Sequence, residues 1–343
     1  MTRSLRLLVS AGAGVCALAF SGAAFAAYNP SLIIAHTNHA LGGTGPVVIG
    51  IGQGQNDDAT AMSTIYAPRG YRLTLGQAPG TVLGNLSGEV KVAALGGSRH
   101  EVEGPVRVDN PANHVNNPCS PGTHEAVWVL EFTLLGNSFR LPMYVDRVTT
   151  GPEAAYASAR IQVCFLSPYV PAPQGSPSGA SLIVAAFSLR GVFRSPASRG
   201  THPWNAVFLP YTPGTATPNP TNTAQSTAFV RLPVQFGMTL KRQRRAKRTF
   251  AIMTACVKEA GVGIRGLRIN FRSGSRRVAS ARTNARGCAK ARIRVRRRMV
   301  ISALVDVPAR QAPNCQPTLA PRCSEPSIAP AFDLVTRGRR IRR

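Results

Sequence analysis

The sequence has 343 residues and a formal net charge of +27, from 41 Lys and Arg against 14 Asp and Glu. Its longest internal apolar run, residues 181–189, is about half the length of a membrane-crossing helix, so we expect no transmembrane segment in a soluble mature chain. The 32 Gly and 27 Pro favour many turns and disfavour long helices.

The N-terminus has the order of features that signal peptidase recognises. Arg3 and Arg6 precede an apolar stretch at residues 7–20, and small residues follow in Ala24-Phe25-Ala26. This order predicts a cleaved secretory signal peptide over residues 1–26. The alternative is a retained membrane anchor, which normally needs roughly 20 apolar residues and a stop-transfer flank. We therefore predict a secreted or cell-surface protein.

The cysteines that remain after cleavage indicate disulfides, because an even set in an exported chain is typical of a disulfide framework rather than of metal ligands or nucleophiles. They are Cys119, Cys164, Cys256, Cys288, Cys315 and Cys323. The connectivity is open from sequence alone. If neighbours along the chain pair, the bridges are Cys119–Cys164, Cys256–Cys288 and Cys315–Cys323.

The positive charge is concentrated at one end of the chain. Residues 238–343 hold 27 Lys and Arg against four Asp and Glu, a net charge of +23, whereas residues 1–237 have a net charge of +4. Such asymmetry is typical of contact with a polyanion. The alternative is composition drift, because a GC-rich genome enriches Arg without selection for binding.

The chain divides by composition into consecutive segments. They are the signal peptide (1–26), a body (27–237) that is one domain or two with a break near 166–177, a basic module (238–308), and a flexible basic tail with a short disulfide loop (309–343).

The body has the alternating pattern of β-strands. Large apolar residues alternate with others in residues 127–134 and again in residues 139–145, with Gly136-Asn137 between them, which predicts a β-hairpin. Pro142 cannot donate a hydrogen bond to a ladder, so we expect its strand at a sheet edge or with a bulge. Further strands are expected at 71–75, 89–92, 160–165, 182–193 and 229–240. Short strands separated by turn residues favour a β-sandwich.

The basic module has the same pattern after a charged connector at residues 241–248. Five strands are expected, at 250–257, 267–272, 278–282, 289–295 and 299–307. In the second of these, apolar residues alternate with Arg268, Asn270 and Arg272, and in the fourth they alternate with Lys and Arg. Burial of the apolar residues therefore places the cations on an outer surface. If those two strands lie side by side, they make one basic sheet face.

Two segments of this module carry a resemblance to a known family. Residues 257–269 contain a Gly-rich turn before Gly266-Leu267-Arg268-Ile269, and residues 283–289 contain a turn in which Asn284 and Gly287 tolerate a positive φ. These segments resemble bacterial immunoglobulin-like and carboxypeptidase-regulatory-like modules. The resemblance implies a small β-sandwich and a role as spacer, adhesion unit or stalk.

The body carries a weaker resemblance, through residues 66–71 and 230–234, to exported proteins of high-GC actinobacteria. This resemblance implies no particular activity. The fold class that we predict is therefore mainly β, a β-sandwich body followed by a smaller immunoglobulin-like β-sandwich module.

No catalytic, cofactor or metal site is predicted. His36 and His39 follow an expected strand, where their spacing divides them between its faces. His124-Glu125 is interpreted as a solvated turn, and Asp57-Asp58 as a polar loop rather than a calcium site. Residues 175–179 lack the central serine of a nucleophile elbow.

The function that we predict is a non-catalytic, structural or adhesion-type exported protein, held to anionic envelope polymers or another polyanion by its basic end. The binding residues are Arg268, Arg272, Lys290, Arg292, Arg294, Arg296, Arg297, Arg298, Arg339, Arg340, Arg342 and Arg343. The alternatives are non-specific extracellular nucleic-acid binding and a carbohydrate-active enzyme. Few aromatic residues follow position 238, so nucleic-acid binding would depend on the backbone phosphates.

Overall fold

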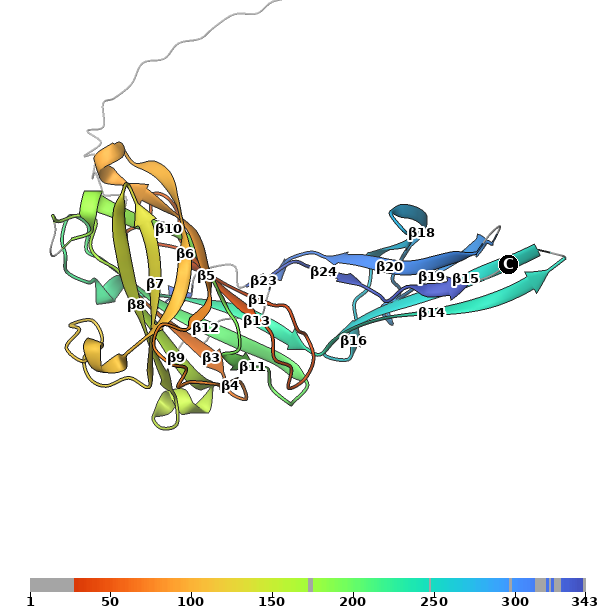
Figure 1. The fold of residues 1–343 in the computed structure, drawn as a ribbon, viewed down its shortest axis with the longest axis horizontal. Helices are drawn as coiled ribbons and strands as arrows, with labels where there is room; N and C mark the ends of the chain where they lie inside the picture. Colours follow the sequence, from red (N-terminus) through yellow and green to blue (C-terminus); the bar gives the residue numbers. More distant parts are fainter. Residues whose placement is uncertain are drawn as a thin grey trace, which may run out of the picture.

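The computed structural model describes residues 28–171, 175–246, 248–295, 298–311, 319–320, 322–323 and 328–341. The fold is mainly β, as predicted, and a slender module projects from one end of a larger body (Figure 1). No helix in the described part of the chain has the length and apolar character that a membrane span requires. The predicted signal peptide, residues 1–26, lies outside the described residues.

The body is built on one continuous antiparallel sheet. Its strand order is β1-β2-β10-β5-β6-β7-β8-β9-β3-β12-β13. The bounds are β1 (Ser31–His36), β2 (Val47–Gly52), β3 (Thr60–Pro68), β5 (Val82–Val92), β6 (Ser98–Asp109), β7 (Ala126–Leu134), β8 (Asn137–Arg147), β9 (Ala157–Cys164), β10 (Ala180–Leu189), β12 (Gly200–Pro210) and β13 (Ala224–Leu232). The separate pair is β4 (Arg72–Leu73) and β11 (Phe193–Arg194). Short 3₁₀ turns are η1 (Ala93–Leu95), η2 (Pro111–His114), η3 (Pro152–Ala155), η4 (Pro177–Gly179) and η5 (Pro220–Asn222).

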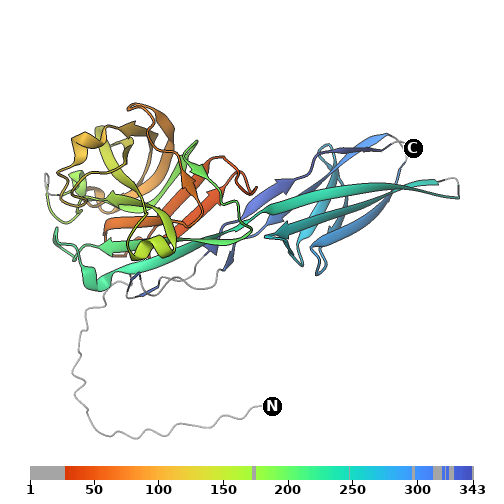
Figure 2. The ribbon, with the colours of Figure 1, turned by 90° about the horizontal axis from the view of Figure 1, so that it is seen from below.

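This sheet folds over on itself, so its inward-facing residues enclose the core (Figure 2). Strand β1 packs against β13, and the Leu32 backbone N–H donates to Ser226 Oγ at 3.0 Å. Trp128 and Trp204 have no exposed surface within this core. Gly104 permits a close approach of β6 and β7, because a Cβ there would lie 1.8 Å from the Glu131 carbonyl oxygen. Strands on both sides of residues 166–177 belong to this one sheet.

The predicted hairpin is confirmed as β7 and β8, which pair antiparallel along all of β7. Its turn residues are Leu135 and Gly136, both at positive φ, one position earlier than predicted. The prediction for Pro142 is wrong, because β8 pairs with β7 on one side and β9 on the other, without a register shift. The chain tolerates this proline because the ladder with β9 begins at Met143, just beyond it.

Two of the three predicted disulfides are confirmed. Cys119–Cys164 ties the loop before β7 to the end of β9. Cys256–Cys288 joins directly paired residues of two neighbouring strands in the module. Cys315 of the third predicted bridge lies outside the described residues.

The single strand expected at residues 229–240 is two strands that belong to different units. Strand β13 of the body sheet ends at Leu232, a cis peptide bond joins Leu232 to Pro233, and β14 (Val234–Arg245) begins the module. The predicted charged connector at residues 241–248 is also wrong. It is the tip of a long hairpin that β14 forms with β15 (Arg248–Glu259), paired as far as Arg245 and Arg248.

The module is a small sandwich of two sheets around its own core, which includes Met253 and Phe271. One sheet contains β14, β15, β16 (Val262–Gly263) and β19 (Cys288–Arg294). The other contains β17 (Arg268–Ser273), β18 (Arg276–Arg282), β20 (Met299–Val307), β24 (Phe332–Val335) and β25 (Arg339–Ile341). The five strands predicted here are confirmed.

The described residues of the segment 309–343 form strands, where the sequence predicts a flexible tail. Strands β21 (Arg310–Gln311), β22 (Arg322–Cys323) and β23 (Ile328–Ala329) join the body sheet, with β22 and β23 parallel to β13. The chain then returns to the module, where β24 and β25 pair with β20.

The junction between the two units contains a buried ion cluster. Glu259, at the end of β15, accepts hydrogen bonds from both terminal nitrogens of Arg310 at 2.7 and 2.9 Å. Arg231 of the body approaches the same carboxylate at 3.6 Å. The Val234 backbone N–H donates to the His39 carbonyl at 3.0 Å. These contacts fix where the module leaves the body.

Candidate polyanion-binding surface

One face of the β14-β15-β19 sheet carries a set of exposed cations. In β19, Lys290, Arg292 and Arg294 point outward, because Ala289 is buried in the core and successive side chains alternate. The strand register places cations of the neighbouring hairpin on the same face, since directly paired residues of antiparallel strands point to the same side. We call this surface the hairpin face; its cations are Lys241, Arg245, Arg248, Lys290, Arg292 and Arg294.

The cations of the hairpin face have no acidic partner among the described residues. The described salt bridges of the module all involve Glu259, which lies at the junction with the body. Along β19 the cations repeat at every second residue, about 7 Å apart. This spacing is shorter than the distance of about 8 to 10 Å over which salt screens exposed charges, so their fields add.

An aromatic side chain lies among these cations. The guanidinium carbon of Arg292 is 3.9 Å from the centroid of the Phe250 ring, and Phe250 is directly paired with Arg294. This cation–π contact restrains the guanidinium group of Arg292 and covers one face of the ring. The hairpin face is therefore partly ordered before any ligand arrives.

The prediction of one basic sheet face from β17 and β19 is wrong, because these strands belong to opposite sheets of the sandwich. Arg268 and Arg272 of β17 are exposed on the outer face of the second sheet, beside Arg282 and Arg277 of β18. That second face also holds two acids. They are Asp306 of β20 and Asp333 of β24, which are directly paired.

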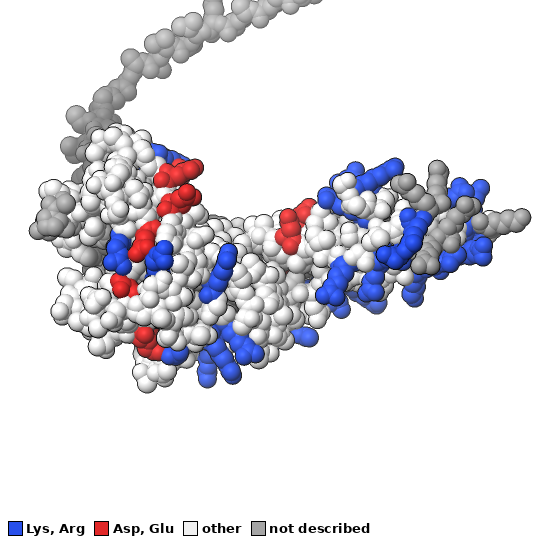
Figure 3. Space-filling model, viewed as in Figure 1, with Lys and Arg blue, Asp and Glu red and all other residues white. Residues whose placement is uncertain are grey.

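The other predicted binding residues are distributed around the module. Arg298 is exposed just before β20, and Arg339 and Arg340 are exposed on β25. Figure 3 shows Lys and Arg gathered on the module while Asp and Glu lie mainly on the body. Four predicted residues lie outside the described residues: Arg296, Arg297, Arg342 and Arg343.

Sequence reasoning missed the hairpin contribution to this surface. The run of charges that contains Lys241, Arg245 and Arg248 hides the strand period and so predicts a connector. The alternating pattern is nevertheless visible before the charged run, because Phe236, Met238 and Leu240 pack inward. The residues between them point outward, and the same alternation continues to the tip of the hairpin.

The body contains a buried His–Asp pair that the sequence assigned to a solvated turn. The His124 side chain is buried, and its Nδ1 lies 3.0 Å from Asp146 Oδ2 while its Nε2 lies 3.1 Å from the Ser120 carbonyl. Burial raises the pKa of Asp146, but hydrogen bonds from Arg160 and His124 outweigh it and hold the pKa below its ordinary value. The pair helps to fix the loop that Cys119 anchors.

The remaining polar candidates serve the structure of the body. His36 lies at the end of β1, where burial and the nearby His39 and His202 lower its pKa to about 4. Asp57 accepts hydrogen bonds from the backbone N–H groups of Asn29 and Gly54, each at 2.9 Å.

Within the described ranges, no group of three or more His, Cys, Asp and Glu side chains could hold a metal ion. No protein-family model matches this chain, and no curated protein matches its sequence.

Proposed function

We propose that this is an exported, non-catalytic protein that is held to anionic polymers of the cell envelope by its basic module. The observation that carries the proposal is the hairpin face, where six cations lie together without a described acidic partner. Uncompensated surface charge of this kind attracts a polymer with many negative charges at moderate affinity and low selectivity.

The way the module is attached to the body supports a role as a spacer. The Glu259 ion cluster and the paired strands at the junction hold the module away from the body, and the cations lie along the module out to its tip (Figure 3). The body is thereby presented at a distance from the anionic surface. The two disulfides and the signal-like N-terminus support export.

The proposal is tested by chromatography of the mature chain, residues 27–343, on heparin and phosphocellulose resins with a salt gradient. In one variant, Lys290→Glu, Arg292→Glu and Arg294→Glu reverse three charges of the hairpin face. A matched control reverses three charges of the opposite sheet, at Arg268, Arg272 and Arg277. The two variants have the same net charge.

We expect the hairpin-face variant to elute at clearly lower salt than the control variant. Equal elution would show that net charge alone governs retention, and the hairpin face would then have no special part. Lack of retention of the unaltered chain, or retention that salt does not weaken, would overturn polyanion binding altogether. Circular dichroism and thermal unfolding establish that both variants are folded.

Nucleic acid is a second polyanion that this surface fits. Because Arg292 already covers one face of Phe250, we expect the phosphates rather than the bases to make the contacts. Duplex DNA and inorganic polyphosphate should then compete for the resin-bound protein equally per phosphate. A strong preference for single-stranded DNA would favour a nucleic-acid ligand instead of an envelope polymer.

A further inference from the structure

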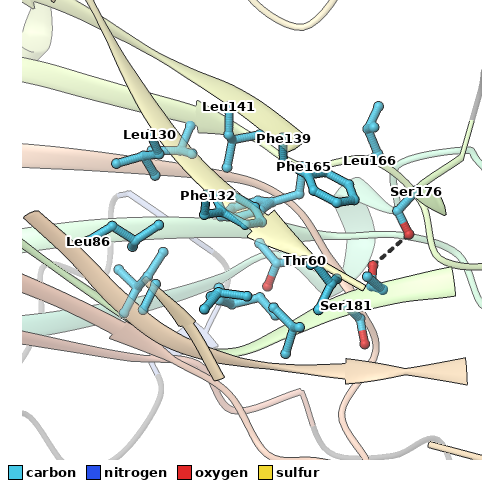
Figure 4. A pocket seen from close by; sticks show the side chains of 18 of the residues that line it. Thr60, Leu86, Leu130, Phe132, Phe139, Leu141, Phe165, Leu166, Ser176 and Ser181 are labelled. Atoms are coloured by element: carbon cyan, nitrogen blue, oxygen red, sulfur yellow. Dashed lines mark hydrogen bonds between the residues drawn. The ribbon is translucent and has the colours of Figure 1, made fainter. Parts of the chain in front are cut away.

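The body contains an apolar cavity that is independent of the basic module. Its volume is about 130 Å³, and residues of eight strands of the body sheet surround it (Figure 4). Leu166, which is 48% exposed, lies at its edge. The cavity is therefore an opening into the core from the surface.

The shape of the cavity follows from the strands that line it. On β7, Leu130, Phe132 and Leu134 all line it, which extends the lining over about 13 Å at the usual rise per strand residue. Spread over that length, 130 Å³ leaves a narrow space. The walls include Ala59 and Ala185, whose small side chains leave room that a larger residue would fill.

The lining is mainly apolar, and the hydroxyl groups of Thr60 and Ser176 already have partners. The Thr60 hydroxyl contacts Gln53 Oε1 and lies 2.8 Å from Tyr28 Oη. The Ser176 hydroxyl donates to the Ala180 carbonyl at 2.7 Å. Nothing in these pairs favours a charged ligand inside the cavity.

Arg140, the charged residue of the lining, already has acidic partners. Arg140 forms ion pairs with Asp109 at 3.1 Å and with Glu131 at 3.3 Å. Several aromatic side chains along the cavity remain only partly buried, including Phe132 and Phe139, which stack at a centroid distance of 5.2 Å. Partly accessible apolar surface of this kind gains free energy when an apolar group covers it.

We propose that this cavity binds one alkyl chain of a small amphiphile, with the polar end of the ligand at the opening beside Leu166. The narrow space fits a chain better than a ring system, and the apolar lining excludes a charged group from the interior. For comparison, an apolar protein cavity of about 150 Å³ holds a molecule as large as benzene. The ligand class is therefore an uncharged or terminally polar alkyl compound.

The test is a ligand-observed NMR titration of the mature chain with 1-butanol, 1-hexanol, 1-octanol and 1-decanol. We expect the affinity to rise about fourfold for each added methylene group until the lined space is filled, and then to level off. Affinity that does not depend on chain length, or no binding of any of these alcohols, would overturn the proposal.

Variants locate the binding to the cavity. Ala185→Leu places a larger side chain in the lining, and we expect at least a tenfold loss of 1-octanol affinity. The matched control is Val184→Leu at the neighbouring position, which is 41% exposed and should bind like the unaltered protein. If Ala185→Leu does not fold, Ala180→Leu at a half-buried position of the lining serves the same purpose. Unaltered binding by both filled variants would refute the assignment.

The result is separable from the polyanion proposal because the alcohols are uncharged. The variant with Lys290, Arg292 and Arg294 changed to Glu should bind 1-octanol as the unaltered chain does. A loss of alcohol binding in that variant would show that the ligand contacts the module and not the cavity.

Discussion

Acid should destabilise the body through His36. Its Nε2 lies 3.1 Å from the Tyr71 hydroxyl, and its ring lies 6.5 Å from that of Trp204. Burial, followed by the charges of His39 and His202, lowers the pKa of His36 from 6.5 to about 4. Between these values the unfolded chain binds a proton that the folded chain does not, so stability falls as the pH falls. At about 1.4 kcal/mol for each pH unit, the loss over this window is about 3 kcal/mol.

The assay is urea unfolding at several pH values between 7.5 and 4, followed by tryptophan fluorescence. Both tryptophans of the chain are buried in the body, so their emission reports on its unfolding. The variant is His36→Gln, which keeps a polar group near Tyr71 and cannot titrate. Its stability should fall by about 3 kcal/mol less than that of the unaltered chain over this range.

The comparison isolates one group because the other titrating groups are present in both proteins. Burial also lowers the pKa values of His39 and His202, and Asp146 titrates below its ordinary value, under this window. The same pH dependence in both proteins would refute the reasoning. It would mean that His36 takes up its proton in the folded state without penalty.

Two further changes test the junction and the hairpin turn. Glu259→Gln should destabilise the protein by about 3 kcal/mol in urea unfolding, because it leaves Arg310 near a group without charge. The exposed pair of Glu89 with Arg99 is the control, and Glu89→Gln should cost less than about 1 kcal/mol. Leu135→Asn should raise the melting temperature, with a gain of about 1 kcal/mol, because Leu135 is exposed at a φ of 51° that asparagine tolerates better. A lower melting temperature would show that the Leu135 side chain stabilises the turn.

The features that depend on local pattern could be predicted from the sequence. The strands follow from alternation, and the β7–β8 hairpin follows from its turn residues, because each needs only neighbouring positions. Pairing each cysteine with its neighbour along the chain predicts both of the disulfides that the structure describes.

The features that depend on distant segments could not be predicted. Alternation places Arg268 and Arg292 on outer faces, but it does not say that their strands belong to opposite sheets. The burial of His124 depends on a loop that a disulfide holds against β9. The cavity was also beyond prediction, because pattern indicates which residues face inward and not how completely they fill the space.

The path of the C-terminal strands determines how the two units stay joined. The chain passes between body and module at Pro233, again between β20 and β21, and a third time between β23 and β24. A protease that cuts one passage therefore leaves the units connected by the others. A force that separates the body from the module is therefore shared among three stretches of backbone.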